Sequence, residues 1–301
     1  MGTRKLESID SVQAGFAREH YVADRDLATA VYLSLALDRP LLLEGEAGVG
    51  KTEVGRTLAA VLKTELIRLQ CYEGLDVTTA VYEWDYPRQM LEIRLLEARG
   101  EAKQAATKDI FSREFLIRRP LLAALENSRP EPPVLLIDEI DRADEEFEAY
   151  LLEVLADFAI TIPEIGTIRA ERPPHVIITS NRTREVHDAL KRRCLYHWID
   201  YPTPERELAI LQQRRPDLPT TLAAEVVAFV QRLRTADLTK VPGIAETIDW
   251  AAALEALGAK RLDAEQVERT LGALLKYQED LAALKGGAAG KLVDEVRAVT
   301  R

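Results

Sequence analysis

Nine consecutive residues early in the chain have the types and the spacing that phosphate chemistry requires. In the stretch GEAGVGKTE, Gly45, Gly50, Lys51 and Thr52 match the pattern G-x-x-x-x-G-K-[S/T]. Glycines let successive backbone N–H groups face phosphate oxygens, and a helix that begins at the lysine adds its positive end. The lysine would reach the β- and γ-phosphates of a nucleotide, and the threonine hydroxyl would bind Mg²⁺. The residues expected to contact nucleotide are Gly45, Glu46, Ala47, Gly48, Val49, Gly50, Lys51, Thr52 and Glu53.

An acidic pair and an amide follow two later apolar runs. Asp138 and Glu139 end the run VLLIDE, and Asn181 ends the run IITSN. Asp138 would hold Mg²⁺ through its water shell, and Glu139 would orient and deprotonate the attacking water. The carboxamide of Asn181 offers both a donor and an acceptor, so it could position that water or contact the γ-phosphate. Together with the phosphate loop, these residues predict nucleotide hydrolysis.

Two arginines in ALKRRCLYHWIDYP have two interpretations. Arg192 and Arg193 can be the solvated end of a helix in a monomer. Alternatively, one of them is an arginine finger that stabilises charge on the nucleotide of a neighbouring subunit. The second interpretation requires a ring of subunits.

The elements that must position these residues follow an α/β pattern. Continuously apolar runs indicate strands buried on both faces, and the order strand, helix, strand implies right-handed crossovers in a parallel sheet. The expected elements are helices at 24–40, 51–65 and 145–158, strands at 41–43, 66–71, 133–138 and 175–181, and a hairpin at 159–168.

After about Thr203 the pattern changes to alanine- and leucine-rich helices with no strand. We therefore expect an α/β domain at 1–202 and a smaller all-α domain at 203–301. The helices expected in the second domain are 204–214, 221–236, 244–257, 263–284 and 289–299.

Composition limits the function classes. The 301 residues are 47% hydrophobic and 30% charged, as in a globular protein, and the net charge of −10 argues against binding to nucleic acid or to an anionic membrane surface. The two cysteines, Cys71 and Cys194, form no CxxC pair and fit a reducing compartment. The stretch MGTRKLESIDS has no apolar signal region, and no run approaches the length of a membrane span. These features predict a cytoplasmic location.

This set of motifs, in this order, resembles the AAA+ ATPases and, within them, the MoxR branch. LLLEGEAGVGKT, LLIDEIDRADEEFEAYLLEVLAD, VIITSN and ALKRRCLYHWIDYP resemble that branch's Walker A, Walker B, sensor 1 and arginine-finger segments. IRLQCYEGLDVTTAVYEWDYPRQML and FLIRRPLLAALE are similar to the CoxD-like subgroup, which is associated with carbon monoxide dehydrogenase maturation. The resemblance covers most of 20–260.

The resemblance implies an α/β P-loop NTPase (AAA+) domain with a parallel sheet and a helical lid, and Mg²⁺-dependent ATP hydrolysis in a hexameric ring with nucleotide at the subunit interface. It also implies chaperone-like activation or maturation of a partner protein, with a molybdenum hydroxylase as candidate client and a von Willebrand factor A domain protein as second partner. Residues 73–118 would hold an extra helical insert, in which Tyr82, Trp84 and Tyr86 are core or interface side chains. The hairpin at 160–168 would face the ring's pore or the partner.

The sequence departs from the MoxR pattern in two places. Arg192 stands where the branch usually has Asp before its finger arginine, so Arg193 is the first choice for the finger and Arg192 the reserve. The segment KVPGIAETIDWAAAL has no clear sensor 2 arginine, and Glu246 or Thr247 falls near that position. Coupling of the lid to the γ-phosphate would therefore run differently, or hydrolysis would be slow.

Three other functions can be weighed on the residues. A nucleic-acid-remodelling motor should have basic pore loops, whereas ITIPEIGTI contains no cation. A nucleotide-gated assembly scaffold with little turnover would not need Glu139 and Asn181, which favour an enzyme. Zinc chemistry finds little support, because the histidines at 175, 187 and 197 form no HExxH motif.

Overall fold

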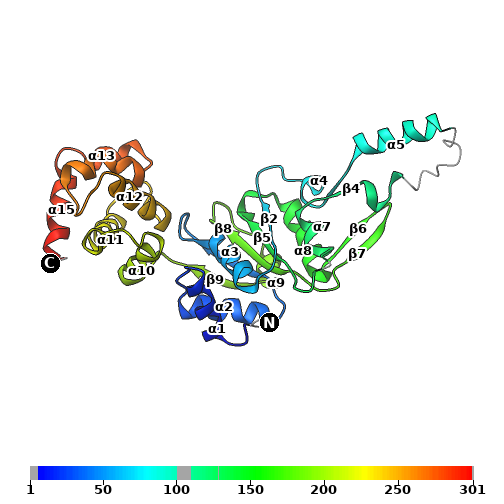
Figure 1. Cartoon of the computed structure of the whole chain (residues 1–301), viewed down its shortest axis with the longest axis horizontal. Coiled ribbons are helices and arrows are strands. Elements are labelled where there is room, and N and C mark those ends of the chain that lie inside the picture. Colours follow the sequence, from blue (N-terminus) through cyan, green and yellow to red (C-terminus); the bar gives the residue numbers. More distant parts are fainter. Residues whose placement is uncertain (1–5, 100–109, 128, 300–301) are drawn as a thin grey trace. The chain divides into compact units, whose positions relative to one another are not determined.

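The computed structural model describes residues 6–99, 110–127 and 129–299 (Figure 1). These residues divide into two compact units. The first unit takes its residues from Met1–Val12, Arg25–Glu44 and Val54–His197, and the second takes its residues from Gln13–Asp24, Gly45–Glu53 and Trp198–Arg301. No single cut in the chain separates the two units, so the domain boundary near residue 202 stays a prediction.

A five-stranded sheet with the order β2-β5-β8-β1-β9 lies at the centre of the first unit (Figure 1). Strands β2 and β5, β5 and β8, and β8 and β1 pair in parallel, which confirms the predicted parallel sheet. Because the carboxyl ends of parallel strands lie at one edge of a sheet, the segments that follow β1, β5 and β8 all leave from that edge. The strands are β1 (Leu41–Gly45), β2 (Leu66–Gln70), β5 (Val134–Asp138), β8 (His175–Ser180) and β9 (Leu195–Ile199).

Helices pack against this sheet, and α8 shows why their sequences form where they do. Asp144 caps its first turn by accepting a hydrogen bond from the Phe147 N–H at 2.8 Å. Its apolar residues recur at helical spacing and are buried, and the chain leaves the helix through Phe158 in the left-handed conformation (φ 46°). The helices assigned to this part of the chain are α1 (Ile9–Arg18), α2 (Arg25–Ala36), α3 (Lys51–Leu62), α7 (Pro120–Leu125), α8 (Glu145–Asp157) and α9 (Asp188–Arg193).

The hairpin predicted at 159–168 is confirmed as β6 (Ala159–Ile162) and β7 (Gly166–Arg169), which pair antiparallel. Helix α1 and strand β9 are among the elements that were not predicted. Helix α1 precedes the first helix expected from the sequence, and β9 was treated only as part of an arginine-finger segment.

The segment between β2 and α7, where an extra helical insert is expected at 73–118, contains strands as well as helices. Strands β3 (Tyr82–Trp84) and β4 (Leu116–Arg118) form an antiparallel ribbon beside the helices α4 (Val77–Ala80) and α5 (Tyr86–Ala98) and the single turn η1 (Arg113–Phe115). Aromatic side chains favour an extended backbone, and Trp84 is buried in the core of the unit. Residues 100–109 of the expected insert lie outside the described residues.

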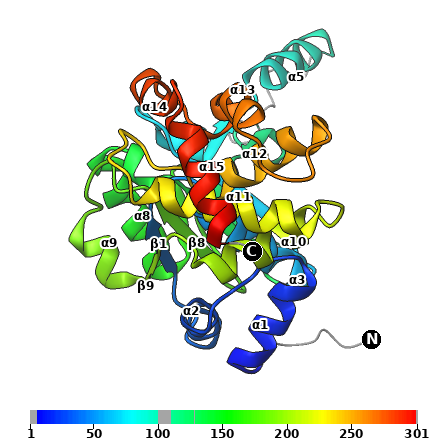
Figure 2. The same ribbon diagram turned by 90° about the vertical axis from the view of Figure 1, so that its left-hand side faces the viewer.

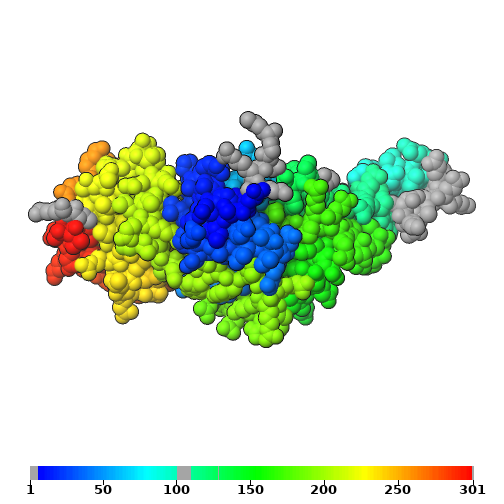
Figure 3. All heavy atoms as spheres, turned by 90° about the horizontal axis from the view of Figure 1, so that it is seen from below, coloured from blue at the N-terminus to red at the C-terminus, as the bar shows by residue number. Residues whose placement is uncertain are grey.

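Helix α5 projects from the first unit (Figures 1 and 3). Its first residue, Tyr86, is 61% exposed, whereas Trp84 is 7% exposed. Of the three aromatic residues considered in the sequence, Trp84 is therefore a core side chain and Tyr86 a surface one.

The C-terminal part of the second unit is all helical, as predicted, and α11 and α15 lie side by side in it (Figure 2). Phe229 of α11 packs on Trp250 of α12 with ring centroids 5.1 Å apart, and both rings are fully buried. The helices are α10 (Pro204–Arg214), α11 (Thr220–Arg234), α12 (Ile244–Ala256), α13 (Ala264–Leu274), α14 (Gln278–Leu284) and α15 (Ala288–Val299).

The single helix predicted at 263–284 is wrong, because α13 and α14 are separate helices. Leu275 ends α13 with an extended backbone (φ −107°, ψ 140°) and is buried. The Asp280 carboxylate of α14 accepts a hydrogen bond from the Thr239 N–H at 2.8 Å. These tertiary contacts outweigh the helix propensity of the intervening residues.

Both cysteines are buried and free. Burial raises the pKa of the Cys71 thiol and of the Cys194 thiol to about 12 each, so both thiols remain protonated at neutral pH. Among the described helices, none combines the length and the apolar character needed to cross a membrane.

Candidate functional site

The predicted phosphate loop runs from the end of β1 to the start of α3, which begins at Lys51. Gly48 and Gly50 have positive φ angles of 81° and 95°, a conformation that other residues rarely adopt. The Lys51 ammonium donates hydrogen bonds to the backbone carbonyls of Gly45 at 2.7 Å and Glu46 at 2.6 Å. Its positive charge is thereby held over the loop, beside the N–H groups at the start of α3.

The first turn of α12 packs directly on this loop. The Ala245 N–H donates to the Gly48 carbonyl at 3.3 Å. A Cβ atom at Gly48 would lie 2.8 Å from Glu246 Oε2, and one at Gly243 would lie 2.9 Å from the Ala47 carbonyl oxygen. Near the position where the sequence lacks a sensor 2 arginine, the structure therefore places a carboxylate against the phosphate loop.

A buried ion pair joins α12 to α10 and α11. Glu207 is fully buried and accepts hydrogen bonds at 2.7 Å from both terminal nitrogens of Arg234, and at 2.8 Å from the Thr247 hydroxyl. Arg234 also donates to the Pro242 carbonyl at 2.9 Å. Thr247, the alternative residue near the sensor 2 position, is thus a buried link within the helical bundle.

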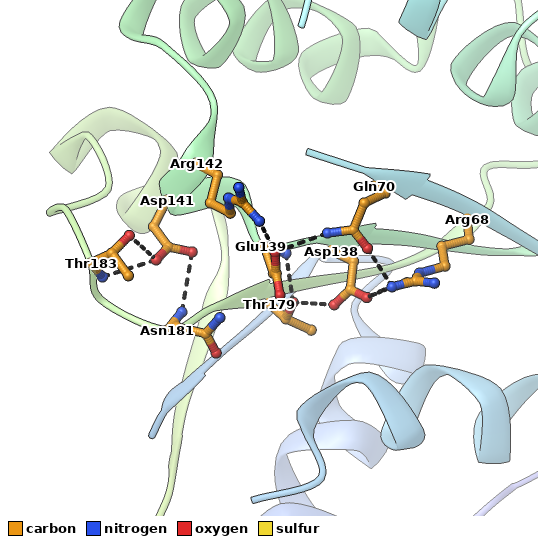
Figure 4. Close-up of polar contacts among 9 residues, drawn as sticks. All are labelled: Arg68, Gln70, Asp138, Glu139, Asp141, Arg142, Thr179, Asn181 and Thr183. Atoms are coloured by element: carbon orange, nitrogen blue, oxygen red, sulfur yellow. Dashed lines mark hydrogen bonds and ion pairs between the residues drawn. The ribbon is translucent and has the colours of Figure 1, made fainter. Parts of the chain in front are cut away.

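The acidic pair lies at the end of β5 (Figure 4). Asp138 is 1% exposed, and its Oδ1 accepts a hydrogen bond from the Thr179 hydroxyl at 2.6 Å. Its Oδ2 accepts a hydrogen bond from Arg68 Nε at 3.0 Å. A buried carboxylate that already pairs with a cation has the charge and the oxygen atoms that Mg²⁺ prefers.

Glu139 follows in the left-handed conformation (φ 58°) and its N–H donates to the Thr179 hydroxyl oxygen at 2.9 Å. Its Oε2 accepts hydrogen bonds from Gln70 Nε2 at 3.0 Å and from Arg142 at 3.2 Å (Figure 4). Gln70 also contacts Arg68, so a continuous line of polar contacts joins the two carboxylates. Gln70 and Arg142 therefore restrain the side chain of Glu139, the candidate catalytic base.

Asn181 is positioned by Asp141, a nearly fully buried residue just beyond the acidic pair. One Asp141 oxygen accepts the Asn181 N–H at 3.1 Å, and the other accepts the Thr183 N–H at 2.9 Å and its hydroxyl at 2.7 Å. The structure therefore brings Asp138, Glu139 and Asn181 to the same edge of the sheet (Figure 4).

The two candidate finger arginines lie in the last turn of α9 and differ in exposure. Arg192 is exposed, whereas Arg193 is half-buried and donates from Nε to the Leu155 carbonyl at 3.2 Å. Arg39 holds the backbone here by donating to the carbonyls of Arg192 at 2.9 Å and Arg193 at 3.0 Å. The choice between the two arginines stays a prediction.

The sequence interpretation missed Gln70, Asp141, Thr179 and Glu44. Glu44 is buried at the end of β1, and its Oε2 accepts a hydrogen bond from the Tyr196 hydroxyl at 3.1 Å. Within the described part of the chain its Oε1 has no hydrogen-bond partner. A polar residue inside an otherwise apolar strand was the available signal for Glu44 and Thr179, since such residues are usually paired when buried.

Comparison with known proteins points to one family. The family profile described as "AAA domain (dynein-related subfamily)" matches residues 40–194, which is more than half of the chain. An uncharacterised protein of Staphylococcus epidermidis is 27% identical over 228 residues, which are 73% of this chain and 76% of the relative. One from Staphylococcus aureus is 26% identical over 206 residues, which are 66% and 70% of the two chains.

One solved structure has a similar fold at a TM-score that supports the comparison. A point mutant of Thermotoga maritima RuvB has a TM-score of 0.50 at 18% identity, covering 92% of this chain and 75% of that one. The structure titled as the Thermotoga maritima RuvB Holliday junction branch migration motor has a TM-score of 0.46 at 17% identity, with coverage of 88% and 71%. Identities this low speak for the fold alone.

Proposed function

Because the chain belongs to the AAA domain family, in its dynein-related subfamily, we propose that it is a Mg²⁺-dependent ATPase that remodels a partner protein. Proteins of this family generally hydrolyse ATP, bind nucleotide with Mg²⁺ and assemble into rings. The single observation that carries the proposal is the acidic pair, because Thr179 fixes both Asp138 and Glu139 at the edge of the sheet where Asn181 also lies.

Each residue then has a defined task. The loop from Gly45 to Glu53, with Lys51, would bind the phosphates, and the oxygens of Thr52 and Asp138 would hold Mg²⁺. The metal, when bound, neutralises charge that develops on the transferred phosphoryl group. Glu139 would orient the attacking water and accept its proton, and Asn181 would hydrogen-bond that water or the γ-phosphate.

One of the two carboxylate oxygens of Glu139 is already occupied by donors from the protein. Gln70 and Arg142 both donate to the same carboxylate oxygen, Oε2, so both lone pairs of that oxygen are already occupied. This restraint is the observation that favours the second candidate function, a nucleotide-gated assembly scaffold with little turnover.

We further propose that the chain forms a hexameric ring in the cytoplasm and belongs to the MoxR branch, near the CoxD-like proteins. Segment similarity supports this placement, and the two free buried cysteines fit a reducing compartment. A molybdenum hydroxylase would then be the client, and a von Willebrand factor A domain protein a second partner. The acidic net charge of −10 argues against a nucleic-acid substrate.

Nucleotide binding is the first test of the proposal. Replacing Lys51 by Ala is expected to weaken ATP binding roughly a hundredfold, because a buried cation held over the loop is lost. Isothermal titration calorimetry with Mg²⁺ present measures the affinity, and Lys63→Ala beyond the end of α3 is the control. Absence of measurable ATP affinity in the unmodified protein would refute the proposed function.

The arginine finger is tested through the dependence of turnover on protein concentration. If a neighbouring subunit completes the site, the rate per subunit rises with concentration as the ring forms. Arg193→Ala and Arg192→Ala are measured separately. The variant that removes the finger should lose the rise with concentration and roughly a thousandfold in hydrolysis rate, while it still binds ATP. Full activity of both variants at high concentration would show that neither arginine is the finger.

A further inference from the structure

We infer that the negative charge of Glu246 weakens phosphate binding at the loop from Gly45 to Glu53. Binding of a polyphosphate there would in turn weaken the contact between this loop and α12, and so affect the helical bundle. The inference deepens the proposed function, because it assigns a role at the same nucleotide site to a residue of α12. It rests on three features of the second unit: a close contact, a fixed negative charge and a rigid connection.

The close contact is made by two glycines. Gly48 and Gly243 approach so closely that a Cβ at Gly243 would lie 3.0 Å from the Gly48 carbonyl carbon, and a Cβ at Gly48 would lie 3.4 Å from the Gly243 Cα. The Ala245 N–H bonds to the Gly48 carbonyl on the same side. Any movement of the loop at Gly48 therefore changes the contacts of the first turn of α12.

The negative charge at this contact is held in place. Glu246 is the third residue of α12, and its Oε2 accepts the Gly243 N–H at 3.1 Å, in the manner of a capping box. Within the described residues no ion pair involves Glu246, so no nearby cation neutralises it through a salt bridge. Its charge and that of Glu46 also help to raise the pKa of the Tyr201 hydroxyl, after the larger effect of burial.

The rigid connection is the buried ion pair. Thr247, the residue after Glu246, donates to Glu207, which also binds Arg234 of α11. Arg234 holds the Pro242 carbonyl just before the glycine contact. The first turn of α12 is thus fastened on both sides to the bundle and moves together with it.

These features place the Glu246 carboxylate where it repels phosphate groups bound at the loop. Phosphates drawn to the loop by its N–H groups and Lys51 approach a carboxylate that cannot swing away without giving up its cap. Bound polyphosphate therefore weakens the contact between α12 and the loop. By thermodynamic linkage that contact weakens polyphosphate binding by the same factor.

Replacing Glu246 by Gln tests the inference, because glutamine keeps the capping hydrogen bond and removes the charge. The variant is expected to bind ATP and ADP about tenfold more tightly at low salt, with the gain shrinking as salt is added. Adenosine, which carries no phosphate, should show no change. Asp249→Asn, which removes one charge from the exposed side of the same helix, is the matched control.

Hydrogen exchange supplies a second readout that does not depend on turnover. In the unmodified protein, added ATP should speed amide exchange at 243–247, and in Glu246→Gln this response should be lost. Equal ATP affinities within twofold, weaker binding by the variant, or an equal gain for adenosine would each overturn the inference. If the unmodified protein and Lys51→Ala both fail to bind ATP, the proposed function fails and the inference falls with it.

Discussion

Replacing Glu139 by Gln is expected to lower the rate of ATP hydrolysis between a hundredfold and a ten-thousandfold, while ATP affinity stays within about threefold. Glutamine can occupy the same place and still contact Gln70 and Arg142, but it cannot accept a proton from water. Phosphate release at saturating ATP and calorimetric titration of the same preparation separate the two effects.

The matched control is Glu146→Gln, which removes the same group from an exposed position on α8. Its hydrolysis rate should equal that of the unmodified protein. If the unmodified protein and Glu139→Gln release phosphate at equal and negligible rates while both bind ATP, the chain is the nucleotide-gated scaffold. If Glu139→Gln retains full turnover, another group is the base.

Replacing Glu207 by Ala is expected to lower the free energy of unfolding of the helical bundle by about 3–5 kcal/mol. Glu207 is fully buried and bonds to Gln231, Thr247 and Arg234, whose side chain is 7% exposed. Without the carboxylate, a buried guanidinium loses its counter-charge and must be hydrated or expelled. Equilibrium urea unfolding of the full chain, followed by circular dichroism, measures the loss.

Two further variants assign the cause. Glu205 lies in the same first turn of α10 but is exposed, so Glu205→Ala should lower the free energy of unfolding far less than Glu207→Ala does. Glu207→Leu combined with Arg234→Met removes both charges together and should recover part of the loss, because no uncompensated charge remains. A loss in Glu207→Ala no larger than in Glu205→Ala would contradict the role given to the pair.

The phosphate loop and the buried strands could be predicted from sequence because their signals are local. The loop pattern spans consecutive residues, and strands such as β5 are apolar up to their last residue because both faces of a parallel strand are covered. Asp138 and Glu139 follow from the position of that strand's end. The α/β fold with a helical C-terminal part was predictable for the same reason.

Residues that act through partners distant in sequence were not predictable. Gln70 reaches Glu139 only because β2 pairs with β5 in a register that sets Gln70 opposite Asp138. Asp141, three residues beyond β5, orients Asn181 at the end of the neighbouring strand β8, and nothing near Asp141 in sequence indicates this. The break between α13 and α14 likewise depends on a carboxylate that binds a distant loop.

The burial of the two thiols has a practical consequence for labelling this protein with fluorescent dyes. Thiol-directed fluorophores react with the ionised sulfur, which Cys71 and Cys194 scarcely supply at neutral pH. One cysteine introduced at an exposed position, such as Asp249 on α12, would accordingly carry nearly all of the dye. The fluorescence of that single dye would then report movements of α12 in a protein that keeps both of its natural cysteines.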